Sequence, residues 1–300
     1  MKTQNAVRKR HNSLHPSFTI FKRSNVMKAL ALFLTRGVAI LAALVLVSAL
    51  VFGQGNYSQT GTITNTGGTL VIKGTAGFGT QTSISGTVNY AKAGGSQSVT
   101  DIDYNILTLS GGAGSGKVFP NADVGVGGNL TLAGGVVSAD VNARPGTSAK
   151  ITYNGAGAQS VAAINYQDIE LATSGTKTFA TGTTKIAGTF SLSGTAAADA
   201  TSNSTTLEFD GSGAQSLAGI NYDNLSITGT RSGTPAITLA SGTIGIKSAF
   251  TVSPTGAVTY VTTGNTLDFN GTVAQTITAF NYNGLTISAA RGVNNVTLAS

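Results

Sequence analysis

The sequence predicts an all-β protein, a parallel β-solenoid built from repeats of about 60 residues. A short block recurs four times at nearly constant spacing, and two-residue alternations of apolar and hydroxyl side chains recur between the blocks. After residue 55, no stretch keeps a helical period over three turns. A repeat array is typical of solenoids, in which each unit buries its apolar face against the neighbouring units.

Residues 1–55 are predicted to be a basic leader and signal peptide, preceding the repeats as a helical segment. They carry eight Lys or Arg residues and no acid, and the apolar core at 38–52 is free of charge. Cleavage is expected near Gly53 or after Gly55. An uncleaved membrane anchor is the alternative, although the core is shorter than the roughly 20 residues that span a bilayer. Met27 is a second candidate for the start, alongside Met1.

Most of the excess positive charge lies in this leader. The chain has 18 Lys and Arg against 11 Asp and Glu, so removing the eight basic residues of the leader leaves 10 against 11. Nucleic acid is therefore not an expected partner. His11 and His15 also lie in the leader, and the chain has no cysteine. Zinc sites of His and Cys, Ser-His-Asp catalysis and disulfides are thus excluded from 56–300.

The recurring block places a glutamine seven residues before a tyrosine. The tyrosines follow one another at intervals of about 60 residues, and the glutamines repeat the same intervals. The repeat-defining residues are Gln97, Tyr104, Gln159, Tyr166, Gln215, Tyr222, Gln275 and Tyr282. We expect them to serve packing at the core or at corners, with an exposed aromatic ladder that stacks on sugars as the alternative.

The block divides the rest of the chain. An N-terminal β segment or cap is predicted at 56–87, followed by repeats at 88–150, 151–206, 207–266 and 267–300. A second landmark, Leu130-Thr131-Leu132 and its equivalents, lies within each of the first three repeats, which predicts about three coils of roughly 20 residues per repeat. Repeat 4 is incomplete, because Val296–Ser300 matches Ile237–Ser241 and the sequence then stops.

One feature favours a different fold, a string of antiparallel β modules. Asn154-Gly155, Asp210-Gly211 and Asn270-Gly271 each follow an aromatic strand residue, and Asn-Gly and Asp-Gly are strong hairpin signals. The solenoid is preferred, and the antiparallel arrangement stays as its alternative.

A glycine-rich segment, Gly111–Lys117, is similar to a phosphate-binding loop. That loop needs Ser or Thr after the lysine and then a helix, but Val118 follows here and no helical pattern begins. The equivalent segment Ser174–Phe179 has the same place in the next repeat. Both are therefore predicted to be turns.

Pairs of acids two residues apart are the remaining candidates for chemistry. They are Asp101 with Asp103, Asp168 with Glu170, and Glu208 with Asp210. Calcium needs six to eight oxygen ligands, and glycoside cleavage needs a carboxylate pair across a cleft. Neither pattern recurs in the other repeats, so no catalytic, metal or cofactor residue is predicted and no enzyme activity is expected here.

The Gly-Ala-Gln-Ser-Val unit with Ile-Asn-Tyr after it, the Gly-Thr-Lys-Thr-Phe turn and the Gly-Thr-Phe-Ser-Leu strand resemble the repeats of large bacterial surface and secreted proteins. Autotransporter passengers and filamentous-haemagglutinin-like adhesins are similar over residues 88–300. The resemblance implies an exported adhesin or structural stalk at the outer envelope or outside the cell. Its partners would be the export machinery and a host or environmental surface, with polysaccharide as one candidate. The alternatives are a glycan-binding or glycan-cleaving solenoid, and a spacer for a catalytic domain beyond Ser300.

Overall fold

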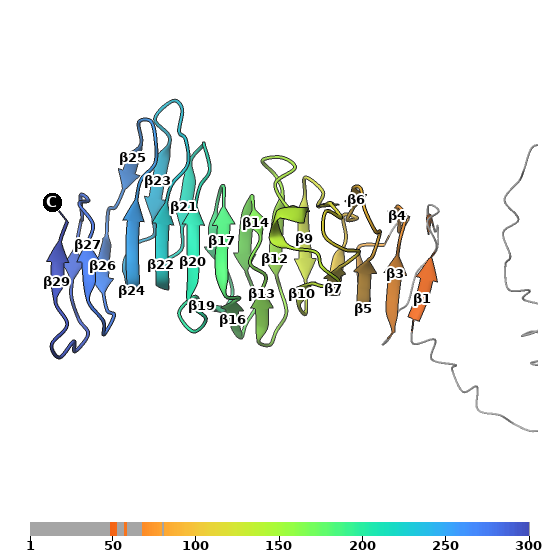
Figure 1. Ribbon diagram of the computed structural model, residues 1–300, viewed down its shortest axis with the longest axis horizontal. Helices are drawn as coiled ribbons and strands as arrows, with labels where there is room; N and C mark the ends of the chain where they lie inside the picture. Colours follow the sequence, from red (N-terminus) through yellow and green to blue (C-terminus); the bar gives the residue numbers. More distant parts are fainter. Residues whose placement is uncertain (1–48, 53–56, 59–67, 80, 300) are drawn as a thin grey trace, which may run out of the picture. The chain divides into compact units, whose positions relative to one another are not determined.

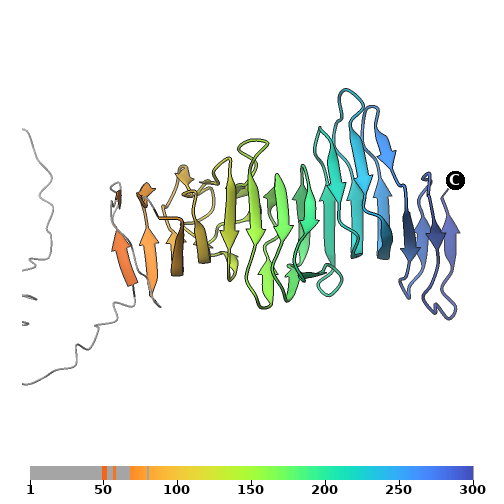
Figure 2. The same ribbon diagram turned by 180° about the vertical axis from the view of Figure 1, so that it is seen from behind.

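The strands follow one another in sequence order along one axis, each turn of the chain stacking on the turn before it (Figures 1 and 2). The computed structural model describes residues 49–52, 57–58, 68–79 and 81–299. These residues form a parallel β-solenoid of about 11 turns, which confirms the predicted fold. The alternative of antiparallel modules is wrong, because the strand pairs of the described residues are parallel.

The largest sheet has nine strands. Its members are β1 (Ala49–Phe52), β3 (Thr69–Ile72), β5 (Ser83–Tyr90), β7 (Asp103–Leu109), β9 (Asp123–Val126), β10 (Leu130–Leu132), β12 (Lys150–Tyr153), β15 (Asp168–Leu171) and β18 (Phe190–Leu192). A second sheet has seven strands: β14 (Asn165–Tyr166), β17 (Gly182–Ile186), β20 (Thr205–Phe209), β22 (Asn221–Ile227), β24 (Gly242–Val252), β26 (Asn265–Phe269) and β28 (Leu285–Thr286).

The remaining strands form smaller sheets. Three sheets have three strands each: β6 (Gln97–Ser98), β8 (Lys117–Val118) and β11 (Val141–Asn142); β13 (Gln159–Val161), β16 (Thr176–Phe179) and β19 (Ala197–Asp199); β21 (Gln215–Leu217), β23 (Ala236–Leu239) and β25 (Thr259–Val261). Two sheets have two strands each: β2 (Tyr57–Ser58) with β4 (Ala76–Gly77), and β27 (Gln275–Ile277) with β29 (Val296–Leu298). Ser138–Asp140 is a single 3₁₀ turn.

A turn of the stack has three sides. In the middle of the chain β12 pairs with β15, β13 with β16 and β14 with β17, so each strand pairs with the third strand after it. Tyr153 pairs with Leu171 of the following turn and with Val126 of the preceding one. The separation in sequence is smaller from Tyr153 to Leu171 than from Val126 to Tyr153, so the turns differ in length. The predicted coil of roughly 20 residues lies between these two separations.

The sequence repeat does not contain a whole number of turns. β20 has in repeat 3 the position that β12 has in repeat 2. From β12 up to, but not including, β20 the chain has eight strands, β12 to β19. Eight strands at three to a turn make two and two-thirds turns. Accordingly β20 lies in the sheet of β14 and β17, whereas β12 lies in the sheet of β15 and β18. Equivalent residues of these two repeats therefore lie on different sides of the stack, and the predicted three coils per repeat were slightly too many.

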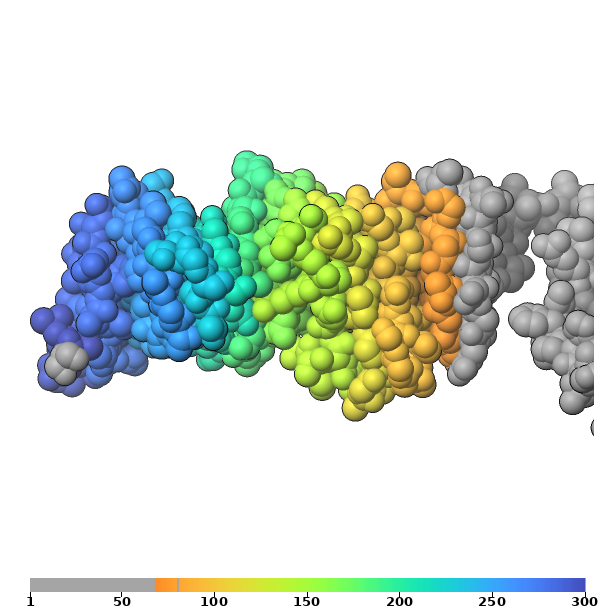
Figure 3. Space-filling model, turned by 90° about the horizontal axis from the view of Figure 1, so that it is seen from above, coloured from red at the N-terminus to blue at the C-terminus, as the bar shows by residue number. Residues whose placement is uncertain are grey.

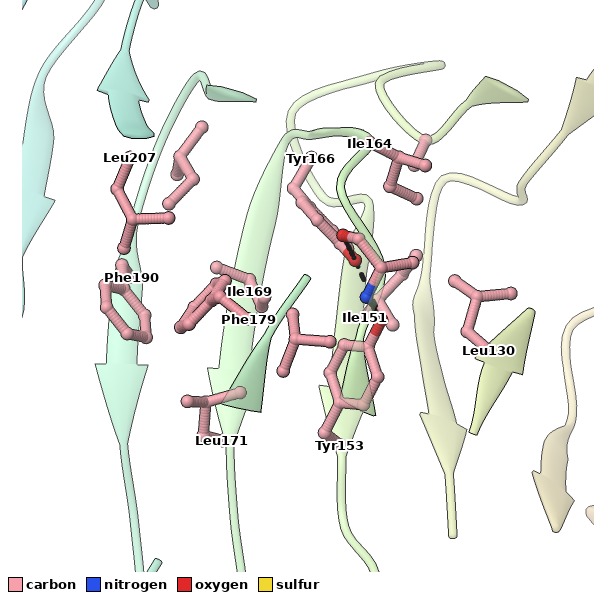
Figure 4. Close-up of a cluster of buried hydrophobic side chains, with 14 of the residues drawn as sticks. Leu130, Ile151, Tyr153, Ile164, Tyr166, Ile169, Leu171, Phe179, Phe190 and Leu207 are labelled. Atoms are coloured by element: carbon pink, nitrogen blue, oxygen red, sulfur yellow. Dashed lines mark hydrogen bonds between the residues drawn. The ribbon is translucent and has the colours of Figure 1, made fainter. Parts of the chain in front are cut away.

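The inward side chains form one continuous apolar core. The strands alternate between buried and less buried residues, as Thr205–Phe209 does with Leu207 and Phe209 inward. Figure 4 shows Ile151, Ile169 and Phe190 from successive turns gathered in this interior. One turn could not bury these side chains alone, and burial of each one contributes roughly 1.5–3 kcal/mol before the entropic cost. In the space-filling view the colours follow the sequence in bands, so each part of that surface comes from neighbouring turns (Figure 3).

The hairpin signals mark close contacts between turns instead of hairpins. A Cβ on Gly155 would collide with the carbonyl oxygen of Gly127, and one on Gly211 with that of Ala187. Glycine stands at these positions because the backbone of the preceding turn passes directly against it. The same dipeptide therefore serves stacking here, and the pattern used for hairpins did not distinguish the two uses.

Most of the predicted leader lies outside the described residues. The end of its apolar core, Ala49–Phe52, is not helical but forms strand β1, which pairs with β3. Apolar residues with a β-branched Val51 suit a strand as well as a signal peptide. The described residues include no helix of the length and apolarity that a membrane crossing requires.

Candidate functional site

The repeat tyrosines point into the stack. Tyr104, Tyr166 and Tyr222 are buried, and Tyr282 is half-buried. Each hydroxyl donates to the carbonyl of the residue four positions earlier, as Tyr166 does to Ala162 at 2.7 Å. For the three buried residues, the exposed aromatic ladder that could stack on sugars is therefore wrong.

In the first two repeats, a second tyrosine meets the repeat tyrosine. The hydroxyls of Tyr153 and Tyr166 are 2.8 Å apart and point toward each other (Figure 4), and Tyr90 meets Tyr104 in the same way. The Tyr153 hydroxyl also accepts a hydrogen bond from the backbone N–H of Ala162. Burial raises the pKa of Tyr153 to about 12 and that of Tyr166 well above its ordinary value. Both hydroxyls thus stay protonated and able to donate.

The repeat glutamines are buried and tie neighbouring turns together. The Nε2 of Gln159 donates to the carbonyls of Val126 and Gly128 in the preceding turn, at 2.7 Å to Val126. Its Oε1 accepts from the backbone N–H of Gly155 in its own turn, at 2.9 Å. Gln97 and Gln275 repeat this arrangement with the carbonyls of Ile72, Gly74, Ile246 and Ser248.

A positively charged side chain from the following turn completes this corner in every repeat. The four residues are Lys117, Lys177, Arg231 and Arg291, which come 20, 18, 16 and 16 positions after the repeat glutamine. Lys177 Nζ donates to the carbonyls of Gly155 and Gly157, at 2.5 and 2.9 Å. Lys117, Lys177 and Arg231 are buried, and their nitrogens donate to backbone carbonyls and, for Lys117, also to the side-chain oxygen of Gln97.

Sequence reasoning missed these cations because it assigned the segments of Lys117 and Lys177 to turns and made no assignment for Arg231 and Arg291. Burial lowers the pKa of Lys117 to about 8, and also lowers the pKa values of Lys177 and Arg231. The signal was present in the sequence as one basic residue at a nearly fixed distance after each glutamine. Lysine stands on the strand paired with the glutamine strand, whereas Arg231 reaches the same corner from the loop before β23.

The acid pairs that were candidates for chemistry lie on the outer surface and bridge turns. Glu170 accepts from Lys150 and from Ser193, and Lys150 also meets Asp123 at 2.8 Å. The hydrogen bond from Lys150, and then that from Ser193, lowers the pKa of Glu170. The carboxylate of Asp168, the other member of that pair, accepts from the backbone N–H of Thr189 at 2.6 Å.

The pair of Glu208 and Asp210 joins a second charged cluster. Arg144 lies 2.8 Å from Asp210, and Lys185 lies 3.1 Å from Glu208 and 3.8 Å from Asp210. Arg144 also donates from Nε to the carbonyl of Tyr166. These charges link successive turns across the outside of the stack.

The remaining motif residues also take positions between turns. Lys117, the last residue of the glycine-rich segment, directs its Nζ at Lys92 O and Gln97 Oε1, away from any loop that could hold a phosphate. Asp103 accepts from the backbone N–H of Gly125 in the next turn, and Asp101 lies just before β7. The described part of the chain has no cluster of three or more His, Cys, Asp or Glu residues that could hold a metal ion.

The outer surface is hollowed at two equivalent places, one in each of two successive repeats. The first groove lies beside β10 and β13 and has a volume of about 520 Å³, and the second lies beside β18 and β21 with about 450 Å³.

Comparison with known proteins gives no further assignment, because no family model, no curated protein and no solved structure matches the chain.

Proposed function

We propose that this chain is an exported bacterial surface repeat protein, an adhesin or structural stalk without catalysis in the described region. The observation that carries the proposal is the use of the repeat itself. Gln, Tyr and the basic residue of each block are directed at backbone groups of their own and the adjoining turns. The repeated residues thus hold the turns together, which is what a rigid extended protein requires.

The outer charges support the same function. The acids of two of the three pairs, Asp168 with Glu170 and Glu208 with Asp210, lie against lysine, arginine or backbone N–H groups of other turns. Partly exposed networks of this kind add little stability pair by pair, but they fix the positions of the turns. Acids held in this way are poorly suited to serve as a general acid and base across a cleft.

The test is labelling of intact cells. The chain has no cysteine, so Ser193→Cys introduces a single thiol at an exposed position between turns. A maleimide that cannot cross membranes should label this variant on intact cells, and removal of residues 1–55 should abolish the labelling. Labelling that appears only after the cells are broken would contradict a surface location.

A second measurement separates the adhesive from the purely structural role. Cells that produce the protein should adhere to a host or environmental surface better than cells that lack it. Shortening the protein by one repeat, residues 151–206, should leave adhesion intact if the solenoid is only a stalk. If the repeats themselves bind, adhesion should fall.

A further inference from the structure

The stack of strands is interrupted at the same point of two successive repeats. β10 and β13 are three strands apart, the spacing at which β12 and β15 pair, yet β10 pairs only with β7 and β13 only with β16. β18 and β21 meet in one bridge, between Thr189 and Ser216, and form no ladder. Each interruption leaves strand edges without the partner that the stack supplies elsewhere.

At the first groove, the interruption follows from the glutamine contacts. Gln159 binds the carbonyls of Val126 and Gly128, just before β10, and Asn129 Oδ1 accepts from the backbone N–H of Ser160 at 2.9 Å. These bonds fix the start of β13 against the start of β10. The 3₁₀ turn Ser138–Asp140 lengthens the chain between the two strands, and they separate beyond the fixed point. The groove opens where they part.

The two grooves are built from equivalent residues. Thr131 and Ser160 of the first correspond to Ser191 and Ser216 of the second. Ala162 and Ala218 are equivalent buried alanines, and Leu132 and Leu192 are equivalent partly buried leucines. The repeat therefore reproduces a surface feature as well as a core.

The chemistry of the lining is hydroxyl-rich and neutral. The first groove offers the hydroxyls of Thr131, Ser138, Ser160, Thr181 and Thr183 and the amide of Asn129. The second offers those of Thr189, Ser191, Ser216 and Thr238. No ionisable side chain lines either of these grooves. A charged ligand would lose hydration there without meeting an opposite charge.

We propose that each groove binds a segment of a neutral oligosaccharide. Hydroxyl groups both donate and accept hydrogen bonds, so serine and threonine side chains match the hydroxyls of a sugar in either direction. The leucine and alanine side chains suit the C–H faces of a sugar ring. Both volumes fall in the range of roughly 300–1,000 Å³ typical of small-molecule sites.

The repeat makes weak sites useful together. Neither lining contains an aromatic side chain apart from Phe190 at the buried end of the second groove, and each groove alone binds weakly as a result. Two sites on one protein bind a long polysaccharide more tightly than either site does, by up to roughly 10²–10⁴ fold. Because the strands of successive repeats occupy different sides of the stack, a single ligand chain must bend around it, or the grooves take separate chains.

The inference rests on the proposed adhesive function and names its partner. The test measures binding of the purified protein to dextran, starch, laminarin and galactomannan, with polygalacturonate as a charged comparison and an extended peptide as a second ligand class. Thr131→Phe fills the first groove and Ser191→Phe the second. Thr243→Phe, at an exposed strand position that lines neither groove, is the control.

We expect binding to at least one neutral polysaccharide, a loss of roughly tenfold or more in each single variant, and no detectable binding in the double variant. The control should bind as the parent protein does, and all variants should keep the β circular dichroism spectrum. The proposal would be overturned if the protein bound none of the neutral polysaccharides or if the double variant bound as well as the parent protein. A preference for polygalacturonate or for the peptide would overturn it too. The cell-labelling experiment tests the surface location independently of sugar binding. A protein that is labelled on intact cells but binds no sugar would refute only the proposal that the grooves bind oligosaccharide.

Discussion

Lys117 Nζ lies 2.9 Å from Oε1 of Gln97, with both side chains buried and their residues paired on adjacent strands. The glutamine binds the carbonyls of Ile72 and Gly74 in the turn before it, and the lysine comes from the turn after it. Three successive turns are thus joined by one pair of side chains. Arg291 donates to Gln275 Oε1 in the same way, whereas Lys177 and Arg231 bind backbone carbonyls at the equivalent corners.

The first prediction concerns the buried lysine. Lys177→Met should lower the free energy of unfolding by about 2–4 kcal/mol, because two buried carbonyls, of Gly155 and Gly157, lose their donor. Urea unfolding measures the change, with exposed Lys73→Met as the control. Equal stability of the two variants would show that the corner does not need the lysine.

The second prediction compares two repeat glutamines. Gln159 binds two carbonyls of the preceding turn and one N–H of its own. For Gln215 the described residues supply a partner for Nε2, at Ile186 O, but none for Oε1. Gln159→Leu should therefore destabilise more than Gln215→Leu, by about 1–2 kcal/mol. A larger loss from Gln215→Leu would argue against the role given to these bonds.

The third prediction concerns the glycine that contacts the preceding turn. Gly211→Ala places a methyl group against the carbonyl of Ala187 and should cost about 2–4 kcal/mol. Gly213→Ala, two residues on, meets nothing within 4 Å and should be nearly neutral. Thermal unfolding of the two variants provides the comparison. Similar melting temperatures would mean that the turns are not packed as closely as described.

These glycines also show what the sequence could and could not predict. The fold followed from period-two strands and a repeat, since both reflect burial that any sequence of this kind must achieve. Asn154-Gly155 was misleading, because a close approach between turns and a hairpin select the same residue. The inward cations were missed because a lone lysine after a glycine-rich segment is typical of an exposed turn. Only the partners of Lys177, 20 and 22 residues away, reveal its use.

The fourth prediction is a pH dependence. The pKa of Lys117 is lowered by burial to about 8, below its ordinary value of 10.5. From pH 8 to 10 the unfolded chain binds more protons than the folded chain, so the free energy of unfolding should rise with pH. Above pH 10 the trend should reverse, because burial raises the pKa values of Tyr166 and Tyr222 and only the unfolded tyrosines ionise.

Urea unfolding between pH 7 and 11 checks this profile. Lys117→Met should show a smaller rise between pH 8 and 10, with the remainder coming from Lys177, whose pKa is lowered in the same direction. An identical rise in the variant would assign the effect to other groups.

The arrangement of the whole stack depends on a repeat being two and two-thirds turns of parallel strands. Thr183 pairs with Thr206, across β17 and β20. If a repeat were three whole turns, Thr206 would take the place of Lys150 in the register and lie beside Thr189, just before β18. The chain has no cysteine of its own, and adjacent strands hold Cα atoms within the roughly 4.4–6.8 Å that a disulfide spans. Under mild oxidation, Thr183→Cys with Thr206→Cys should form an intramolecular disulfide, and Thr189→Cys with Thr206→Cys should not. The reverse result would contradict the arrangement of the repeats.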